Sequence, residues 1–288
     1  MPTTTPVPAF ATIATIQQAI TVLLTTREPL FQRFGLSLFL AIVTGVIVWQ
    51  GIKMMLAHSK GLDDQMYAFV VLLLKACVVY GIVVFYDAPI PGVGVSFTNV
   101  ITDTCAYFMN VMDARSLENT FGHLDTLWSR FLVPDTWSIL ANLIYWLMLI
   151  VITVTKAFAL AVVAFGLIAS GVCALLGPLF VPWLLLPGLD WLFWGWLKSF
   201  VQYSFIPVVA FAYLMVFEQF IYAFVTTIPQ GISDAQYPLY ALQVIVVVGT
   251  FAFGIVLVPY LTTSLFSGHA HGSGRGFLAV LAKQYGDR

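Results

Sequence analysis

The chain has 288 residues, of which 60% are hydrophobic and only 9% are charged, and its formal net charge is -1. Soluble domains carry about 25% charged residues, so this composition excludes an ordinary soluble protein and is typical of an integral membrane protein. Without a basic surface, a tightly bound nucleic acid is also excluded. We therefore expect an all-α, polytopic membrane protein.

Residues 1–33 are expected to form an N-terminal amphipathic helix outside the bilayer. The opening Met-Pro-Thr-Thr-Thr-Pro-Val-Pro has neither the basic segment nor the cleavage site of a signal peptide, so the first true span is expected to direct insertion. Across residues 10–24, apolar residues recur at helical spacing, and Thr and Gln occupy the rest of the surface. Arg27-Glu28-Pro29 is expected to end this helix, because proline lacks an amide donor.

Residues 34–86 are predicted to hold the first two transmembrane helices, over 34–56 and 66–86. Each is long enough for a hydrocarbon core that needs about 20 apolar residues. Lys53 and Lys60 place the connection between them in the cytoplasm. Lys75, near the middle of the second span, costs about 3 kcal/mol on the insertion scale, and the surrounding apolar residues return about 5 kcal/mol. The second span is therefore expected to insert.

Residues 87–136 form the one sizeable polar region. Apolar residues at helical spacing predict two amphipathic helices here, within 97–112 and 117–131. Acidic residues outnumber basic ones, which favours the outer face of the membrane.

Residues 137–266 form a second hydrophobic half. The stretch 137–176 is longer than one crossing needs, and because neither glycine nor proline lies near Lys156, we expect one long helix that continues out of the membrane. A second long helix over 191–227 should be kinked by Pro207, and the last span covers 239–260. Small residues at four-residue steps predict a helix-packing face in a bundle or an oligomer; they are Gly166, Ser170 and Ala174.

Between these two long helices, an elbow is predicted at residues 177–190. Glycines and prolines interrupt the apolar run there; they are Gly177, Pro178, Pro182, Pro187 and Gly188. Lipid offers no hydrogen bonds, so broken backbone at membrane depth must be shielded by protein or by a water-filled cavity. Nearby tryptophans also fit the alternative, an ordinary short loop flanked by the aromatic belts of two spans.

The ionisable residues within the predicted spans are Lys75, Lys156, Lys198 and Glu218. A charge inside the membrane usually faces a partner or a cavity, so we consider an intramembrane contact between Glu218 and either Lys75 or Lys198. The alternative is that Lys156 and Lys198 extend their ammonium groups to the membrane surface.

No motif in the sequence points to catalysis. The glycine-rich tail lacks the phosphate-loop pattern, and His269 and His271 without a third ligand are a weak metal signal. We predict no enzyme activity, no catalytic residue, no metal and no cofactor. The tail, 267–288, carries Arg275, Lys283 and Arg288, which favours the cytoplasm. About five crossings satisfy these charge biases, and six remain possible.

The core of the elbow resembles a known family. Leu176-Gly-Pro-Leu-Phe-Val-Pro-Trp-Leu-Leu-Leu-Pro, followed by Phe193-Trp-Gly-Trp-Leu-Lys-Ser-Phe, is similar to the core of the TrbL family. The order of the parts also agrees over roughly residues 30–268. Members of this family are polytopic inner-membrane subunits of type IV secretion and conjugation systems, corresponding to the sixth component of the VirB type.

The resemblance implies a channel or platform subunit that oligomerises in the bacterial inner membrane, with its N-terminus in the periplasm and its C-terminus in the cytoplasm. Implied partners are the secretion ATPases, pilin and the pilus-tip protein, with DNA or protein substrate passing transiently. The periplasmic central region would meet substrate or pilus, and its candidate contacts are Phe108, Phe121 and Trp128. Two alternatives stay open: a proton-coupled or facilitated transporter of small solutes, and a scaffold without a conduction role.

Overall fold

The computed structural model describes residues 9–56, 62–111, 115–135 and 137–266. Across these ranges the chain forms helices and no strand, and Phe131 and Ile232 make an isolated β-bridge. Within these described ranges, five helical segments are long and apolar enough to cross a membrane. The predicted all-α, polytopic fold with about five spans is therefore confirmed. The predicted tail, with His269 and His271, lies outside the described residues.

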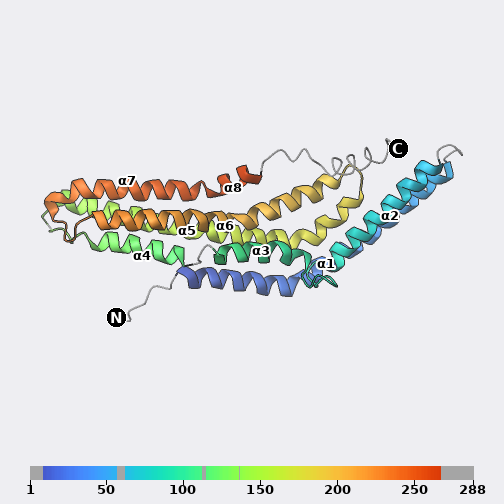
Figure 1. Cartoon of the computed structure of the whole chain (residues 1–288), viewed down its shortest axis with the longest axis horizontal. Helices are drawn as coiled ribbons and strands as arrows, with labels where there is room; N and C mark the ends of the chain where they lie inside the picture. Colours follow the sequence, from blue (N-terminus) through green and yellow to red (C-terminus); the bar gives the residue numbers. More distant parts are fainter. Residues whose placement is uncertain (1–8, 57–61, 112–114, 136, 267–288) are drawn as a thin grey trace.

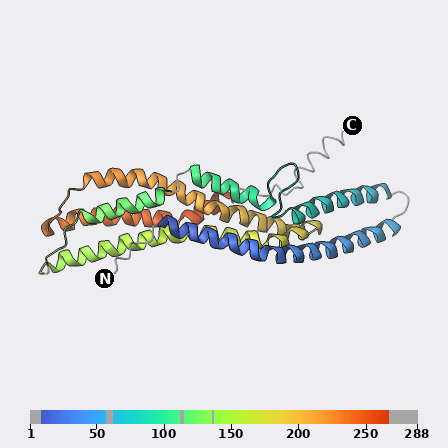
Figure 2. The same cartoon turned by 90° about the horizontal axis from the view of Figure 1, so that it is seen from below.

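The helices form an elongated bundle from which a helical hairpin projects at one end (Figures 1 and 2). The hairpin consists of the second part of α1 (Ala9–Leu56) and of α2 (Leu62–Val84). In the bundle, α5 (Ile139–Phe180) packs on α1, on α6 (Asp190–Thr227) and on α7 (Tyr237–Val256). The end of the bundle that holds α4 and α7 lies opposite the hairpin (Figure 1).

The first helix, α1, is one continuous element of 48 residues that contains Pro29. The predicted end of a short helix at residues 27–29, with a separate span from residue 34, is therefore wrong. An internal proline costs about 3 kcal/mol because one backbone hydrogen bond is lost. Here α1 meets α5 at Ile20, before the proline, and it packs on α5 at Gly35 and on α2 at Phe39, after the proline. Tertiary contacts therefore hold both sides in helical form. Figure 1 shows α1 changing direction between these two parts.

The central region contains α3 (Phe97–Val111) and α4 (Ser116–Ser129), so the two helices predicted there are confirmed. Both pack along α6. Met109 of α3 and Leu124 of α4 lie inside the core of the bundle, whereas Val100 and Val111 of α3 stay exposed.

The long helix α5 runs through Lys156 without a turn, as predicted, and it also runs through Gly177 and Pro178. Those two residues therefore do not break the helix, contrary to the predicted elbow. The break follows in the 3₁₀ helix η2 (Val181–Leu185) and at Gly188, whose φ of 92° favours glycine. With 42 residues, α5 is about 63 Å long at about 1.5 Å per residue, twice the thickness of a hydrocarbon core of about 30 Å.

The helix α6 is also continuous and contains Pro207. After it, the short 3₁₀ helix η3 (Asp234–Gln236) leads into α7, and a turn at Leu257 separates α7 from α8 (Val258–Phe266).

Among the described residues, buried side chains form two separate cores. The larger core fills the bundle between α4, α5, α6 and α7. The smaller core lies where the hairpin joins the bundle, a place that we call the hairpin root, and it includes Phe39, Val79, Tyr86, Trp196 and Phe200.

Candidate functional site

Tyr86, which follows α2, lies at the centre of the hairpin root and is fully buried. Its hydroxyl donates a hydrogen bond to the carbonyl of Ala174 in α5, at 2.7 Å. Its own carbonyl accepts hydrogen bonds from the amide of Thr98, at 3.1 Å, and from the Thr98 hydroxyl, at 2.7 Å. Tyr86 thus joins the hairpin to both α3 and α5.

The bond from Tyr86 replaces one that Pro178 cannot make. In an α-helix the carbonyl of residue 174 would accept from the amide of residue 178, and proline has no amide hydrogen. Buried carbonyls are nearly always paired, and here the Tyr86 hydroxyl is the donor. The neighbouring carbonyl of Cys173 accepts from the indole Nε1 of Trp196, at 2.8 Å. Side chains from two other elements therefore complete the last turns of α5.

Two glycines permit this close approach. A Cβ on Gly177 would lie 1.8 Å from the Tyr86 hydroxyl and 2.5 Å from Cζ2 of Trp196. A Cβ on Gly35 of α1 would lie 2.3 Å from the carbonyl oxygen of Pro178. All three distances are impossible for a real side chain, so α1, α5 and the rings of the hairpin root meet where only glycine fits.

The remaining elbow residues divide into two groups. Pro182 is buried beneath the hairpin, because η2 packs on α1, α2 and α6. Pro187 and Gly188 lie in the exposed turn that leads into α6.

The predicted small-residue face contacts different neighbours along its length. A Cβ on Gly166 would lie 2.6 Å from Cδ of Pro207, so α5 meets α6 at the proline. Ser170 lines a cavity and donates to the Leu167 carbonyl in its own helix, whereas Ala174 is buried in the hairpin root. The prediction missed Gly171, on which a Cβ would lie 2.7 Å from Cγ2 of Ile20 in α1. The sequence signal that could have indicated this contact was the presence of one more glycine in an apolar helix.

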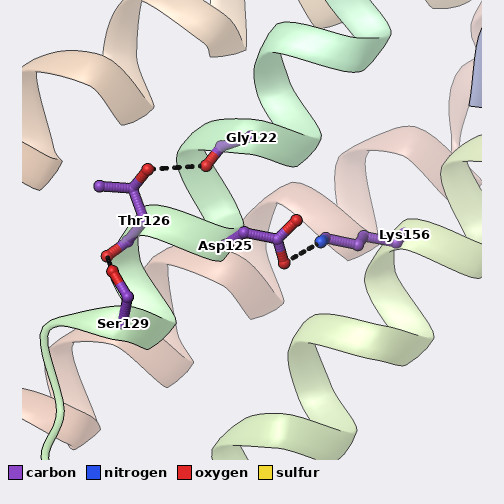
Figure 3. Close-up of polar contacts among 5 residues, drawn as sticks. All are labelled: Gly122, Asp125, Thr126, Ser129 and Lys156. Carbon is purple, nitrogen blue, oxygen red and sulfur yellow. Dashed lines mark hydrogen bonds and ion pairs between the residues drawn. The ribbon is translucent and has the colours of Figure 1, made fainter. Parts of the chain in front are cut away.

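Lys156 of α5 forms an ion pair with Asp125 of α4 (Figure 3). Its ammonium group also lies 5.6 Å from the centre of the Phe121 ring. In the same view, the hydroxyls of Thr126 and Ser129 donate to carbonyls of their own helix, so these side chains do not reach α5. Lys156 therefore attaches α4 to the side of α5, a contact that the sequence did not predict.

Glu218 of α6 accepts a hydrogen bond from the side-chain amide of Asn119 in α4, at 2.9 Å. The predicted contact with Lys75 or Lys198 stays a prediction, because within the described chain no ion pair joins Glu218 to either lysine. The physical reason is position: α4 covers α6 at Glu218, whereas Lys75 lies on the hairpin and Lys198 is exposed near the start of α6.

Two hollows flank the hairpin root. A groove of about 650 Å³ lies between α1, α2 and the elbow, and Lys53 and Lys75 line it together with Gly45. Nothing lies within 4 Å of a Cβ placed on Gly45, so this groove is open. A polar cavity of about 470 Å³ lies on the bundle side of the root, between α1, α3, α5 and α6.

The three aromatic candidates of the central region differ in exposure. Phe108 is 38% exposed and its ring lies 6.3 Å from that of Phe205. Phe121 lies beneath Lys156, and Trp128 packs on Tyr145 with 4.1 Å between ring centres. Of the three, Phe108 is the one that presents an open face.

In the part of the chain that the structure describes, five membrane-length apolar helices, joined through a packed elbow, define a polytopic α-helical membrane protein. The family of TrbL/VirB6 plasmid conjugal transfer proteins matches residues 43–258, which include most of the hairpin, the elbow and most of the bundle. The chain belongs to this family, which places it in conjugal transfer and type IV secretion. Comparison with curated proteins gave no match.

Proposed function

We propose that this protein is an inner-membrane channel or platform subunit of a type IV secretion system, supporting the translocation of DNA or protein and the formation of the pilus. The family match over residues 43–258 carries this proposal. It covers the elbow and the packed centre of the fold rather than a peripheral segment.

In this proposal the protein does no chemistry itself. Energy comes from partner ATPases, and the subunit supplies a membrane path or platform through contacts with copies of itself and with other secretion subunits. Apolar side chains that remain exposed along the long helices suit such contacts as well as lipid; on α5 they include Leu143, Ile150, Phe158 and Phe165. The N-terminus lies in the periplasm and the C-terminus in the cytoplasm, so that α3 and α4 belong to the periplasmic side.

The surface of α3 is the part that we assign to pilin, pilus-tip protein or substrate in transit. Its outer face carries three strongly exposed apolar residues, Val100, Tyr107 and Val111, which are 51%, 66% and 64% exposed. Phe108 lies beside them and lines a shallow groove together with Val100 and Tyr107. An apolar strip of this kind on an otherwise packed helix is typical of a binding surface.

Photocrosslinking in cells that carry the complete secretion system tests this assignment. A photoreactive phenylalanine analogue at Tyr107 or Phe108 should capture pilin, a pilus-tip protein or transferred DNA. The matched controls are Phe121 and Trp128, which face α5 and should give crosslinks within the chain only. If the outer positions give only self-crosslinks in a protein that still assembles, the result would favour a bare scaffold or a solute transporter.

A further inference from the structure

The polar cavity on the bundle side of the hairpin root has an unusual lining for a membrane protein. Three acidic residues line it, Glu28 of α1, Asp87 after α2 and Asp103 of α3, together with several hydroxyl and amide side chains. Among the lining residues in the described part of the chain, none is basic. The lining therefore offers oxygen atoms and negative charge, with no side chain to neutralise them.

Two buried oxygen atoms in this cavity lack a hydrogen-bond partner. Glu28 and Ser204 of α6 are each only 4% exposed. Within the described chain, Oε1 of Glu28 and Oγ of Ser204 make no hydrogen bond. Burying a polar atom unpaired is costly, and such atoms in native proteins usually contact an ion or ordered water. These two come from different helices and line the same cavity.

The backbone adds to the negative potential at this place. Helix α2 ends at Val84, and the C-terminus of a helix carries the negative end of its dipole. The side-chain amide of Gln32 donates to the carbonyls of Val83 and Val84, both at 3.1 Å, and so holds this end against α1 one turn beyond Glu28. Asp87, which is exposed, lies three residues beyond Val84. An acidic residue just beyond a helix C-terminus is unfavourable unless a positive charge lies nearby.

We propose that this cavity binds a hydrated divalent cation, Mg²⁺ or Ca²⁺, through the carboxylates of Glu28 and Asp87, with the Ser204 hydroxyl as a neutral ligand. Oxygen ligands suit hard cations of this kind. The described residues contain no group of three or more His, Cys, Asp or Glu placed to hold a metal ion, so the chain would supply at most two carboxylates and water would complete the coordination. Mg²⁺ in particular keeps several waters and needs only one or two carboxylates.

The cavity has the volume for such an ion with its water, since it measures about 470 Å³ and one water occupies about 30 Å³ of liquid. A cation there would connect α1, the loop after α2, and α6. It would therefore fix the direction of the hairpin relative to the bundle, next to Pro29 of α1. This role is separate from the proposed contacts with pilus or substrate.

Thermal unfolding of the purified full-length protein tests the proposal. The protein, stripped with a chelator in detergent, is titrated with Mg²⁺ or Ca²⁺ at constant ionic strength, with Na⁺ as the reference salt, and tryptophan fluorescence is followed. A divalent cation should raise the unfolding temperature by several degrees by mass action. Glu28→Gln should abolish the shift, and Ser204→Ala should weaken the apparent affinity by at least about tenfold. Glu118→Gln, at an exposed acid of α4, should retain it.

Three results would overturn the proposal: no shift in the unaltered protein, an equal shift with Na⁺, or an undiminished shift in Glu28→Gln. If Glu28→Gln does not fold, Asp87→Asn takes its place. Direct binding of Mn²⁺, followed by electron paramagnetic resonance, should give about one site per chain in the unaltered protein. Absence of such a site there would also overturn the proposal.

Discussion

Replacing Tyr86 with Phe removes one oxygen atom from the hairpin root and keeps the buried ring. The carbonyl of Ala174 then loses its donor, because Pro178 cannot supply one from within the helix. A buried acceptor left without a partner costs about 1–3 kcal/mol. Since about 1.4 kcal/mol corresponds to a factor of ten, the ratio of folded to unfolded protein should fall about 5-fold to 150-fold.

Unfolding by SDS in mixed micelles measures this loss. Tryptophan fluorescence is a suitable signal, because the Trp196 ring lies 6.4 Å from that of Tyr86. The matched control is Tyr67→Phe on α2, where the side chain is 74% exposed. This control should change the free energy of unfolding by less than about 0.5 kcal/mol.

Combining Tyr86→Phe with Pro178→Ala tests whether the lost stability comes from the unpaired Ala174 carbonyl. In Pro178→Ala the new residue carries an amide hydrogen that can donate to the Ala174 carbonyl within the helix. Tyr86→Phe should then cost less than about 1 kcal/mol, because the acceptor keeps a partner. If Tyr86→Phe costs the same in both backgrounds, the hydroxyl does not replace the bond lost at Pro178, and our account of the elbow is refuted.

Gly177→Ala should destabilise the protein by about 1–3 kcal/mol or more in the same assay, because its Cβ would lie 1.8 Å from the Tyr86 hydroxyl. The control is Gly195→Ala on α6, where a Cβ meets nothing within 4 Å; it should be neutral or stabilise the protein by up to about 1 kcal/mol. Equal changes in the free energy of unfolding at Gly177 and Gly195 would contradict the packing argument. Burial raises the pKa of the Cys105 thiol from about 9 to about 11, which lowers its reactive thiolate fraction about 100-fold. In a Cys77→Ser, Cys173→Ser variant, the maleimide reaction rate should rise about ninefold between pH 9 and pH 10. A rise of less than about twofold, as for a thiol with a pKa of about 9, would show that Cys105 is not buried.

The number and type of the membrane-length helices could be predicted because apolar length is a local property. The absence of glycine or proline near Lys156 correctly predicted one helix in α5. The same local rule failed at Pro29 and Pro178, which both lie inside helices. At Pro178 the reason is specific. The hydrogen-bond donor that replaces the proline's missing amide hydrogen is the Tyr86 hydroxyl, and Tyr86 lies 88 residues away from Ala174 in the chain. A short sequence window cannot detect such a partner.

The contacts of charged residues could be predicted only in part. The sequence locates Glu218 in an apolar run, but its partner Asn119 is neutral and 99 residues distant, so no charge pattern connects them. Lys156 likewise has its partner, Asp125, on an amphipathic helix whose packing position the sequence does not specify. Spacing alone placed Gly166 on a packing face without indicating that Pro207 is the neighbour.

Hydrogen bonds between residues far apart in the chain, at the hairpin root and at the opposite end of the bundle, can form only after the later residue has been synthesised. At the hairpin root, Tyr86 must wait for Ala174 to be made. At the opposite end, Arg130 donates to the carbonyl of Ile228, a residue 98 positions later. A ribosome that stops after α4 therefore releases a fragment whose buried polar groups have no partners, and such a fragment is a substrate for proteases. Only finished chains would accumulate in the membrane, which protects a multi-subunit machine from incorporating incomplete parts.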